Sequence, residues 1–105
     1  VWRVLEGRLQ RGPFSVITGG ALGVDRLGEA FARKHGLHVV VIEPDYRTWP
    51  GHEAPLVRNG VIANECDGML AWPKRSEGRV SGGTVNAISW ARKWGRDVVV
   101  RRPWA

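Results

Sequence analysis

Two glycine-rich turns hold the residues of this chain whose types and spacing best suit chemistry. Residues 18–25 read TGGALGVD, and residues 81–86 read SGGTVN. Each turn opens a predicted helix, whose first N–H groups are unpaired and carry a partial positive charge. Because glycine lets a ligand approach the backbone closely, such turns favour phosphate, although glycine also serves a turn for steric reasons alone. Two such turns in one small protein indicate a phosphorylated ligand, such as a nucleotide.

The side chains of these turns each have two interpretations. Ser81 and Thr84 either donate hydroxyls to an anion or cap the helix that follows them. Asp25 either stabilises the dipole of its own helix or has a functional role, in holding a ribose hydroxyl or ordering the turn. Aimed at phosphate, its carboxylate would repel the ligand. The predicted ligand-binding residues of the two turns are Gly19, Gly20, Ala21, Gly23, Asp25, Ser81, Gly82, Gly83 and Thr84.

Three further candidates lie between the turns. Arg58 opens a short predicted helix, where a positive charge opposes the helix dipole, so we expect a contact with phosphate or ribose; a surface ion pair is the alternative. Asn59 beside it either orients a ligand or caps local backbone. Trp49 lies in the long loop before that helix, where its ring either stacks on a base or packs against the protein.

Composition limits the class of protein. The chain has 105 residues, 43% of them hydrophobic and 25% charged, which fits one globular domain over residues 1–105. Its net charge of +6 favours anionic partners, namely nucleotides, nucleic acid or phosphate esters. No apolar run approaches the ~20 residues that span a bilayer and no leader is visible, so we expect a cytoplasmic protein without a membrane partner. Cys66 is alone and the histidines are scattered, so no disulfide, metal site or cofactor is expected.

The elements that must position these residues alternate along the chain. Strands are expected at residues 14–18, 38–42, 68–72 and 97–101, with helices before and after the first strand and at residues 55–64 and 83–94. Val24, Leu27 and Phe31 form the apolar stripe of the second helix, and Pro55 stands at the first position of the third. Residues 73–80 read as a polar loop.

This order predicts an α/β protein with an open, mostly parallel Rossmann-like sheet and helices on both faces. The apolar strand at residues 38–42 is of the kind that is covered on both faces, and the start within a helix indicates that an N-terminal strand precedes residue 1. Because the carboxyl ends of parallel strands share one edge, both glycine turns and the loops at residues 46–53 and 72–80 are expected to line one crevice. Trp90 and Trp94 share a helix face, which indicates packing or a subunit contact in an expected homo-oligomer.

With these residues in place, the chain resembles the SLOG superfamily, a Rossmann-like group that includes the Lonely Guy (LOG) phosphoribohydrolases, the YspA-like proteins and the DNA-processing protein A family. The resemblance runs from residue 16 to about residue 100, is nearest to the YspA-like branch, and implies a nucleotide-binding pocket. It rests on three motifs, namely Thr18-Gly19-Gly20-Ala21-x-Gly23-Val24-Asp25, Trp49-x-Gly51-x-x-Ala54-Pro55-x-x-Arg58-Asn59 and Ser81-Gly82-Gly83-Thr84-x-Asn86-Ala87.

In LOG enzymes an arginine works with a glutamate on the N-glycosidic bond of a nucleoside monophosphate. Arg58 resembles that arginine, which makes it the candidate catalytic residue, while Ala87 stands at the glutamate position. Without a carboxylate this chemistry loses a principal group, unless Glu43 or Glu53 replaces it. The resemblance therefore implies a nucleotide sensor or degenerate hydrolase, with an N-glycosidase as the alternative.

The DNA-processing protein A family carries a similar Gly-x-Asp turn, Arg-Asn segment and Ser-Gly turn, and in that family the fold binds single-stranded DNA. The matching positions here are residues 23–25, Arg58 and Asn59 with Ile62, and residues 81–82. The excess of arginine is compatible with that role, because affinity for phosphates needs no base readout. We expect a nucleotide or nucleotide-derived phosphate ester at the carboxyl edge of the sheet, with single-stranded DNA as a further alternative.

Overall fold

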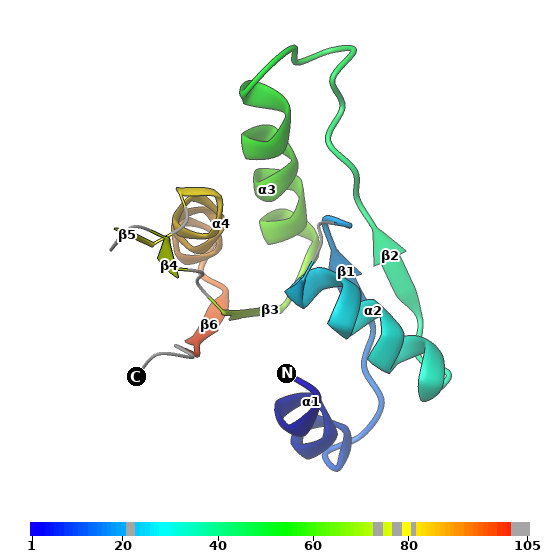
Figure 1. Ribbon diagram of the computed structural model, residues 1–105. Helices are drawn as coiled ribbons and strands as arrows, with labels where there is room; N and C mark the ends of the chain where they lie inside the picture. The colour runs from blue at the N-terminus through cyan, green and yellow to red at the C-terminus, as the bar shows by residue number, and fades with distance from the viewer. Residues whose placement is uncertain (21–22, 73–74, 77–78, 81, 102–105) are drawn as a thin grey trace. The chain divides into compact units, whose positions relative to one another are not determined.

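The computed structural model describes residues 1–20, 23–72, 75–76, 79–80 and 82–101. Within these residues the chain divides into two compact units, Val1–Glu43 and Pro44–Ala105, hereafter the first and second units. Helices and parallel strand pairs in both units confirm the α/β class, and no described helix is long and apolar enough to cross a membrane. The elements are α1 (Trp2–Leu9), β1 (Val16–Thr18), α2 (Val24–Lys34), β2 (Val39–Val41), α3 (Glu53–Glu65), β3 (Gly68–Ala71), β4 (Arg75–Ser76), β5 (Arg79–Val80), α4 (Gly82–Lys93) and β6 (Asp97–Val100) (Figure 1).

The first unit is a β-α-β arrangement preceded by one helix. Strand β1 pairs in parallel with β2, with Val16 opposite Val39 and Thr18 opposite Val41. Helix α2 connects the two strands and packs on both, and α1 packs on α2 (Figure 1). Because β1 ends at Thr18, the first glycine turn leaves the carboxyl end of this strand pair.

Phe31 is the centre of the core of the first unit and is fully buried. The Trp2 ring meets it edge-on, with 5.7 Å between the ring centroids. Phe14 stacks on it at 6.4 Å, and the His35 ring lies 4.3 Å away. A buried aromatic side chain supplies a large apolar area, so this ring joins α1, α2 and the segment before β1.

The buried face of α2 is rotated from the predicted apolar stripe. Leu27 is 46% exposed, whereas Gly28 and Ala32 are buried together with Phe31. A β-carbon at Gly28 would lie 3.9 Å from Cγ1 of Val16, so α2 approaches β1 with its smallest residues. Of the predicted apolar stripe, Phe31 is buried, whereas Leu27 lies outside the buried face of α2.

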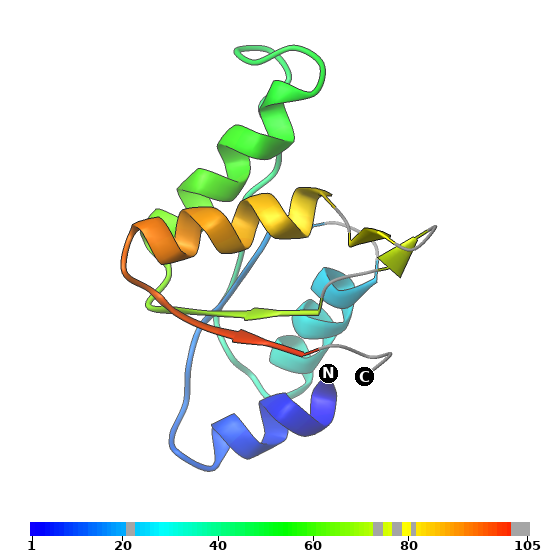
Figure 2. The same cartoon turned by 90° about the vertical axis from the view of Figure 1, so that its left-hand side faces the viewer.

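The second unit is also a β-α-β arrangement, with one further helix. Strand β3 pairs in parallel with β6, with Met69 opposite Val98. Helix α4 connects these strands and packs on both, and α3 packs on α4 (Figure 2). Because α4 follows the carboxyl end of β3, its first residues, Gly82 and Gly83, belong to the carboxyl side of this pair. Its buried apolar residues are mostly small, namely Ala54, Ala63, Ala71, Ile88 and Ala91.

One valine in each parallel strand pair is exposed. Val41 in β2 is 38% exposed and Val99 in β6 is 43% exposed. Among the described residues of the first unit, α2 packs on β2, and cover on both faces of residues 38–42 stays a prediction. The parallel strands form two pairs of two, and a single Rossmann-like open sheet stays a prediction.

Three element boundaries differ from the predictions. Strand β1 begins at Val16 and not at residue 14. The Val16 amide donates a hydrogen bond to the His38 carbonyl. Helix α3 begins at Glu53, which makes Pro55 its third residue; the missing N–H is tolerated because the first-turn amides have no partner within a helix. The predicted polar loop at residues 73–80 contains the short antiparallel pair of β4 and β5.

Candidate functional site

The first glycine turn is held by side chains of its own unit. The Gly19 amide donates to Oδ2 of Asp25 at 3.0 Å, and the Gly20 amide donates to Oγ1 of Thr18 at 3.3 Å. Gly20 has a φ of 72° and Gly23 a φ of 89°, which L side chains rarely adopt. A β-carbon at position 20 would also lie 3.0 Å from a Val41 methyl group, so this turn needs glycine for steric reasons.

This geometry favours one of the two interpretations of Asp25. Its carboxylate accepts the Gly19 amide, so Asp25 orders the turn from the first turn of α2. The Gly19 amide, which we predicted to bind phosphate, therefore already has the negative charge of Asp25 beside it. That charge would repel a phosphate. Ala21, the remaining predicted residue of this turn, lies outside the described residues.

Asn59 is the centre of a second polar cluster, in the second unit. Its side chain is buried, and the residue is only 7% exposed. Its Nδ2 donates to the Gly83 carbonyl at 3.2 Å and to Oδ1 of Asn86 at 3.1 Å. Its Oδ1 accepts a hydrogen bond of 3.0 Å from Nε of Arg58. Asn59 therefore joins α3 to the first turn of α4 and orients the guanidinium of Arg58.

A close approach of α3 and α4 makes this junction possible. Gly60 faces Trp90, and a β-carbon there would lie 3.2 Å from the indole ring. The indole is fixed in turn, because Trp94 stacks on it at 6.4 Å and Nζ of Lys93 lies 5.1 Å from its centroid. Asn59, next to Gly60, is thereby brought within hydrogen-bonding distance of Gly83.

The cluster formed by Arg58, Asn59, Gly83 and Asn86 (hereafter the Asn59 cluster) has the electrostatics of an anion site. Arg58 as a whole residue is half-buried, and its side chain carries the positive charge of the cluster. It is oriented by a residue that also contacts the start of α4, where helix N–H groups carry partial positive charge. Thr84 lies in the same turn of α4 as Gly83, and Ser81 lies outside the described residues.

The loop before α3 carries the remaining predicted site residue, Trp49, which is 41% exposed. Asp45 organises the loop, accepting hydrogen bonds from the Thr48 hydroxyl at 2.7 Å and from the backbone amides of Arg47 and Thr48. The hydrogen bond from the Thr48 hydroxyl, with those from the amides, lowers the pKa of Asp45. The Trp49 amide donates to the Asp45 carbonyl at 3.0 Å, so this turn sets the backbone that carries the indole.

Three residues with a clear role were not among the predicted site residues. Glu29 is 1% exposed and accepts a hydrogen bond of 2.8 Å from the Thr18 hydroxyl. Asn86 completes the Asn59 cluster. Its position one helical turn after Gly82 could have indicated that its side chain lies near the second glycine turn. Arg96 donates from Nε and Nη2 to the last carbonyls of α3, at residues 63 and 64, at 2.9 and 2.7 Å.

The carboxylates considered as substitutes for the missing glutamate lie on the surface. Glu43 and Glu53 are both exposed, and Glu53 is the first residue of α3. Ala87, at the position of that glutamate, is half-buried on α4. The described residues contain no group of three or more side chains that would hold a metal ion.

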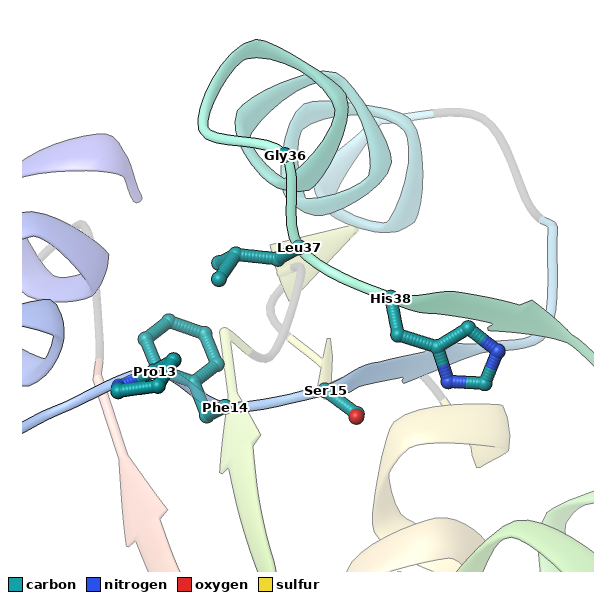
Figure 3. Close-up of a pocket in the computed structure, with 6 residues that line it drawn as sticks. All are labelled: Pro13, Phe14, Ser15, Gly36, Leu37 and His38. Carbon is teal, nitrogen blue, oxygen red and sulfur yellow. The ribbon is translucent and has the colours of Figure 1, made fainter.

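A shallow hollow of about 340 Å³ lies at the other end of the first strand pair, where β1 and β2 begin. The Phe14 ring and the Leu37 side chain lie near one another there, while Ser15 and His38 point away from them (Figure 3). None of the predicted site residues lines this hollow, whose other lining residues are Pro13 and Gly36.

Comparison of the chain with known protein families, with characterised proteins and with solved structures finds no match. The resemblance to the SLOG superfamily therefore stays a prediction from the motifs.

Proposed function

We propose that this chain binds a nucleotide or a nucleotide-derived phosphate ester at the carboxyl ends of its parallel strands, with the phosphate at the Asn59 cluster. The observation that carries the proposal is the hydrogen bonding of buried Asn59 to both Arg58 and the Gly83 carbonyl. The Rossmann-like open sheet, the relation to the SLOG superfamily, the cytoplasmic location and a homo-oligomer belong to the same proposal.

The chemistry of Arg58 suits a phosphate. A guanidinium carries five N–H donors, and its Nε–H is the one that Asn59 accepts. Holding a long side chain in one orientation before binding reduces the entropy lost when the ligand arrives. Arginine also matches phosphate oxygens with two parallel hydrogen bonds, which ammonium groups do not.

Calorimetric titration with inorganic phosphate, AMP, ADP-ribose and adenosine tests the proposal. We expect the phosphate-bearing ligands to bind and adenosine, which lacks a phosphate, to bind much more weakly. Arg58→Ala should weaken AMP binding by about tenfold to a hundredfold, the loss expected for hydrogen bonds to a charged group.

Arg92→Ala is the matched control, because it removes the same charge from the exposed last turn of α4. An equal loss of affinity in both variants would reduce the effect to net charge and contradict the proposal. Retention of AMP binding by Arg58→Ala would contradict it as well.

Binding, and not cleavage, is proposed. An N-glycosidase would need a carboxylate, and the described Glu43 and Glu53 are exposed surface residues. Titration with single-stranded DNA oligonucleotides tests the remaining alternative, since DNA would bind with a steep dependence on salt and with an affinity that grows with strand length.

A further inference from the structure

Among the described residues, Glu29 is the buried ionisable side chain, and the proposed function does not use it. It lies on α2, one helical turn after Asp25, and is 1% exposed. Its two oxygens have different surroundings. Oε2 accepts the Thr18 hydroxyl at 2.8 Å, and Oε1 lies 3.8 Å from Arg26 and 3.9 Å from Arg33, whose positive charges offset the buried negative one.

The direction of the hydrogen bond from Thr18 follows from the chemistry of a carboxylate. An ionised carboxylate accepts hydrogen bonds and has none to donate, so the Thr18 hydroxyl must point its hydrogen at Glu29. The lone pairs of that hydroxyl then face the other way, and the Gly20 amide donates to them at 3.3 Å. Glu29 therefore determines what Thr18 offers to the glycine turn.

We propose that Glu29 is the positioning residue of the Gly19–Gly20 turn. Through Thr18 it holds the Gly20 amide, while Asp25 holds the Gly19 amide directly. Both carboxylates come from α2 at positions four apart, so a single helix face fixes two successive amides of the turn. The hydrogen bonds of Glu29, Thr18 and Asp25 are present without a ligand, so the positioning role of Glu29 does not depend on the proposed function. Only an effect of Glu29 on ligand binding would rest on that function.

Amide hydrogen exchange followed by NMR on the full chain tests this role. The variant Thr18→Val/Glu29→Leu replaces both partners by apolar side chains of similar size, a change that is often close to neutral for stability. We expect exchange at Gly20 to accelerate by about five- to tenfold, the factor for one ordinary hydrogen bond. Exchange at Gly19, which Asp25 holds, and in α2 should stay as in the parent chain.

A purely structural role for Glu29 would give a different pattern. Exchange would then rise together at Gly19, at Gly20 and throughout α2, and that result overturns the proposal. Unchanged exchange at Gly20 overturns it too. Thr18→Ser keeps the hydroxyl and should retain the parent exchange rate at Gly20.

Glu29→Gln keeps the test decisive if the double variant does not fold. The amide is nearly the same size but can donate as well as accept, so the Thr18 hydroxyl is no longer held in one direction. We expect the Gly20 amide resonance to move while the Gly19 resonance does not, and an unmoved Gly20 resonance contradicts the role. Failure of AMP to bind would end the proposed function and leave this measurement unaffected, so the two can fail separately.

Discussion

The two glycine turns of this protein form hydrogen bonds with side chains of different chemistry. In the first unit, Asp25 holds the Gly19 amide, and Glu29 acts on Gly20 through a hydroxyl. In the second unit, Asn59 joins the start of α4 to the cationic side chain of Arg58. Nearly the same glycine pattern therefore has carboxylates around it in one unit and a guanidinium in the other. Under the proposed function, the charge of the neighbouring side chains, more than the glycines, decides which turn binds the anion.

The cores of the two units differ in a related way. The first unit is built around one fully buried ring, Phe31. In the second unit the buried apolar residues are mostly alanines, and a glycine of α3 packs against the indole of Trp90. A ring-centred core depends on one side chain, whereas small residues let helices approach so closely that polar groups of both can pair. The predictions that follow test this contrast.

Phe31→Ala should have the largest effect, because it empties the centre of the first core. We expect the free energy of unfolding to fall by about 3–5 kcal/mol. Leu27→Ala on the same helix is the control, since Leu27 is 46% exposed and should lose far less. Urea unfolding followed by tryptophan fluorescence measures both, and equal losses would show that the ring is not the centre of this core.

Asn59→Ala should be next, with a loss of about 2–3 kcal/mol, because the three hydrogen bonds of this buried side chain, of about 1 kcal/mol each, are lost. The same measurement on Asn64→Ala provides the control, since that side chain is exposed at the end of the same helix. A loss no larger at Asn59 than at Asn64 would remove the structural basis of the Asn59 cluster.

Gly60→Ala should destabilise by about 1–2 kcal/mol, because the added methyl group lies 3.2 Å from the Trp90 indole and overpacks the contact. Gly7→Ala in α1 meets nothing within 4 Å and should stabilise by about 0.5–1 kcal/mol through helix propensity. Thermal unfolding of the two variants should shift in opposite directions. A gain in stability at both positions would mean that α3 and α4 have room to spare.

Asp25→Asn separates the two turns by ligand binding. Losing a favourable charge at the start of α2 should lower stability by about 0.3–1 kcal/mol. AMP affinity should stay within experimental error, because the phosphate is proposed to lie at the Asn59 cluster. A clear gain in affinity would instead place an anion at the Gly19 amide, where the carboxylate now repels it.

The smallest effect should come from Cys66 and depends on pH. Burial raises the pKa of the Cys66 thiol, and the charge of Arg96 acts in the opposite direction. A raised folded-state pKa favours the thiol form, so the stability it contributes is present below the pKa of the unfolded thiol and is lost as pH rises through the folded-state pKa. Cys66→Ala should therefore reduce the fall in stability between neutral and alkaline pH, and an unchanged slope contradicts this.

Much of the fold could be predicted from local signals. Gly36 and Gly95 follow helices α2 and α4 with φ values of 66° and 71°, so the sequence located both helix ends correctly. The buried face of α2 could not be predicted, because Gly28, which lies on that face, makes no contribution to an apolar pattern. The burial of Glu29 also escaped prediction, since its partner Thr18 lies eleven residues away, in a strand.

The candidate site could be predicted only in part. The hydrogen bond from Asn59 to the Gly83 carbonyl brings two of the predicted site residues together, but their role in binding stays a prediction. The distribution of charge between the two turns was not predicted. Motif spacing indicates where backbone amides lie close together, but it does not show which side chains form hydrogen bonds with them. A crevice shared by both turns stays a prediction.

Arg96 has a consequence for how the second unit would respond to proteolysis. Arg96 lies in the segment between α4 and β6 and donates hydrogen bonds to the final carbonyls of α3. These bonds connect the end of α3 to elements that follow it by about thirty residues. A protease that nicks the exposed segment around Arg47 and Trp49 would break the backbone before α3 but leave this attachment intact. The product of limited digestion should therefore be a stable carboxyl-terminal fragment that begins just before α3.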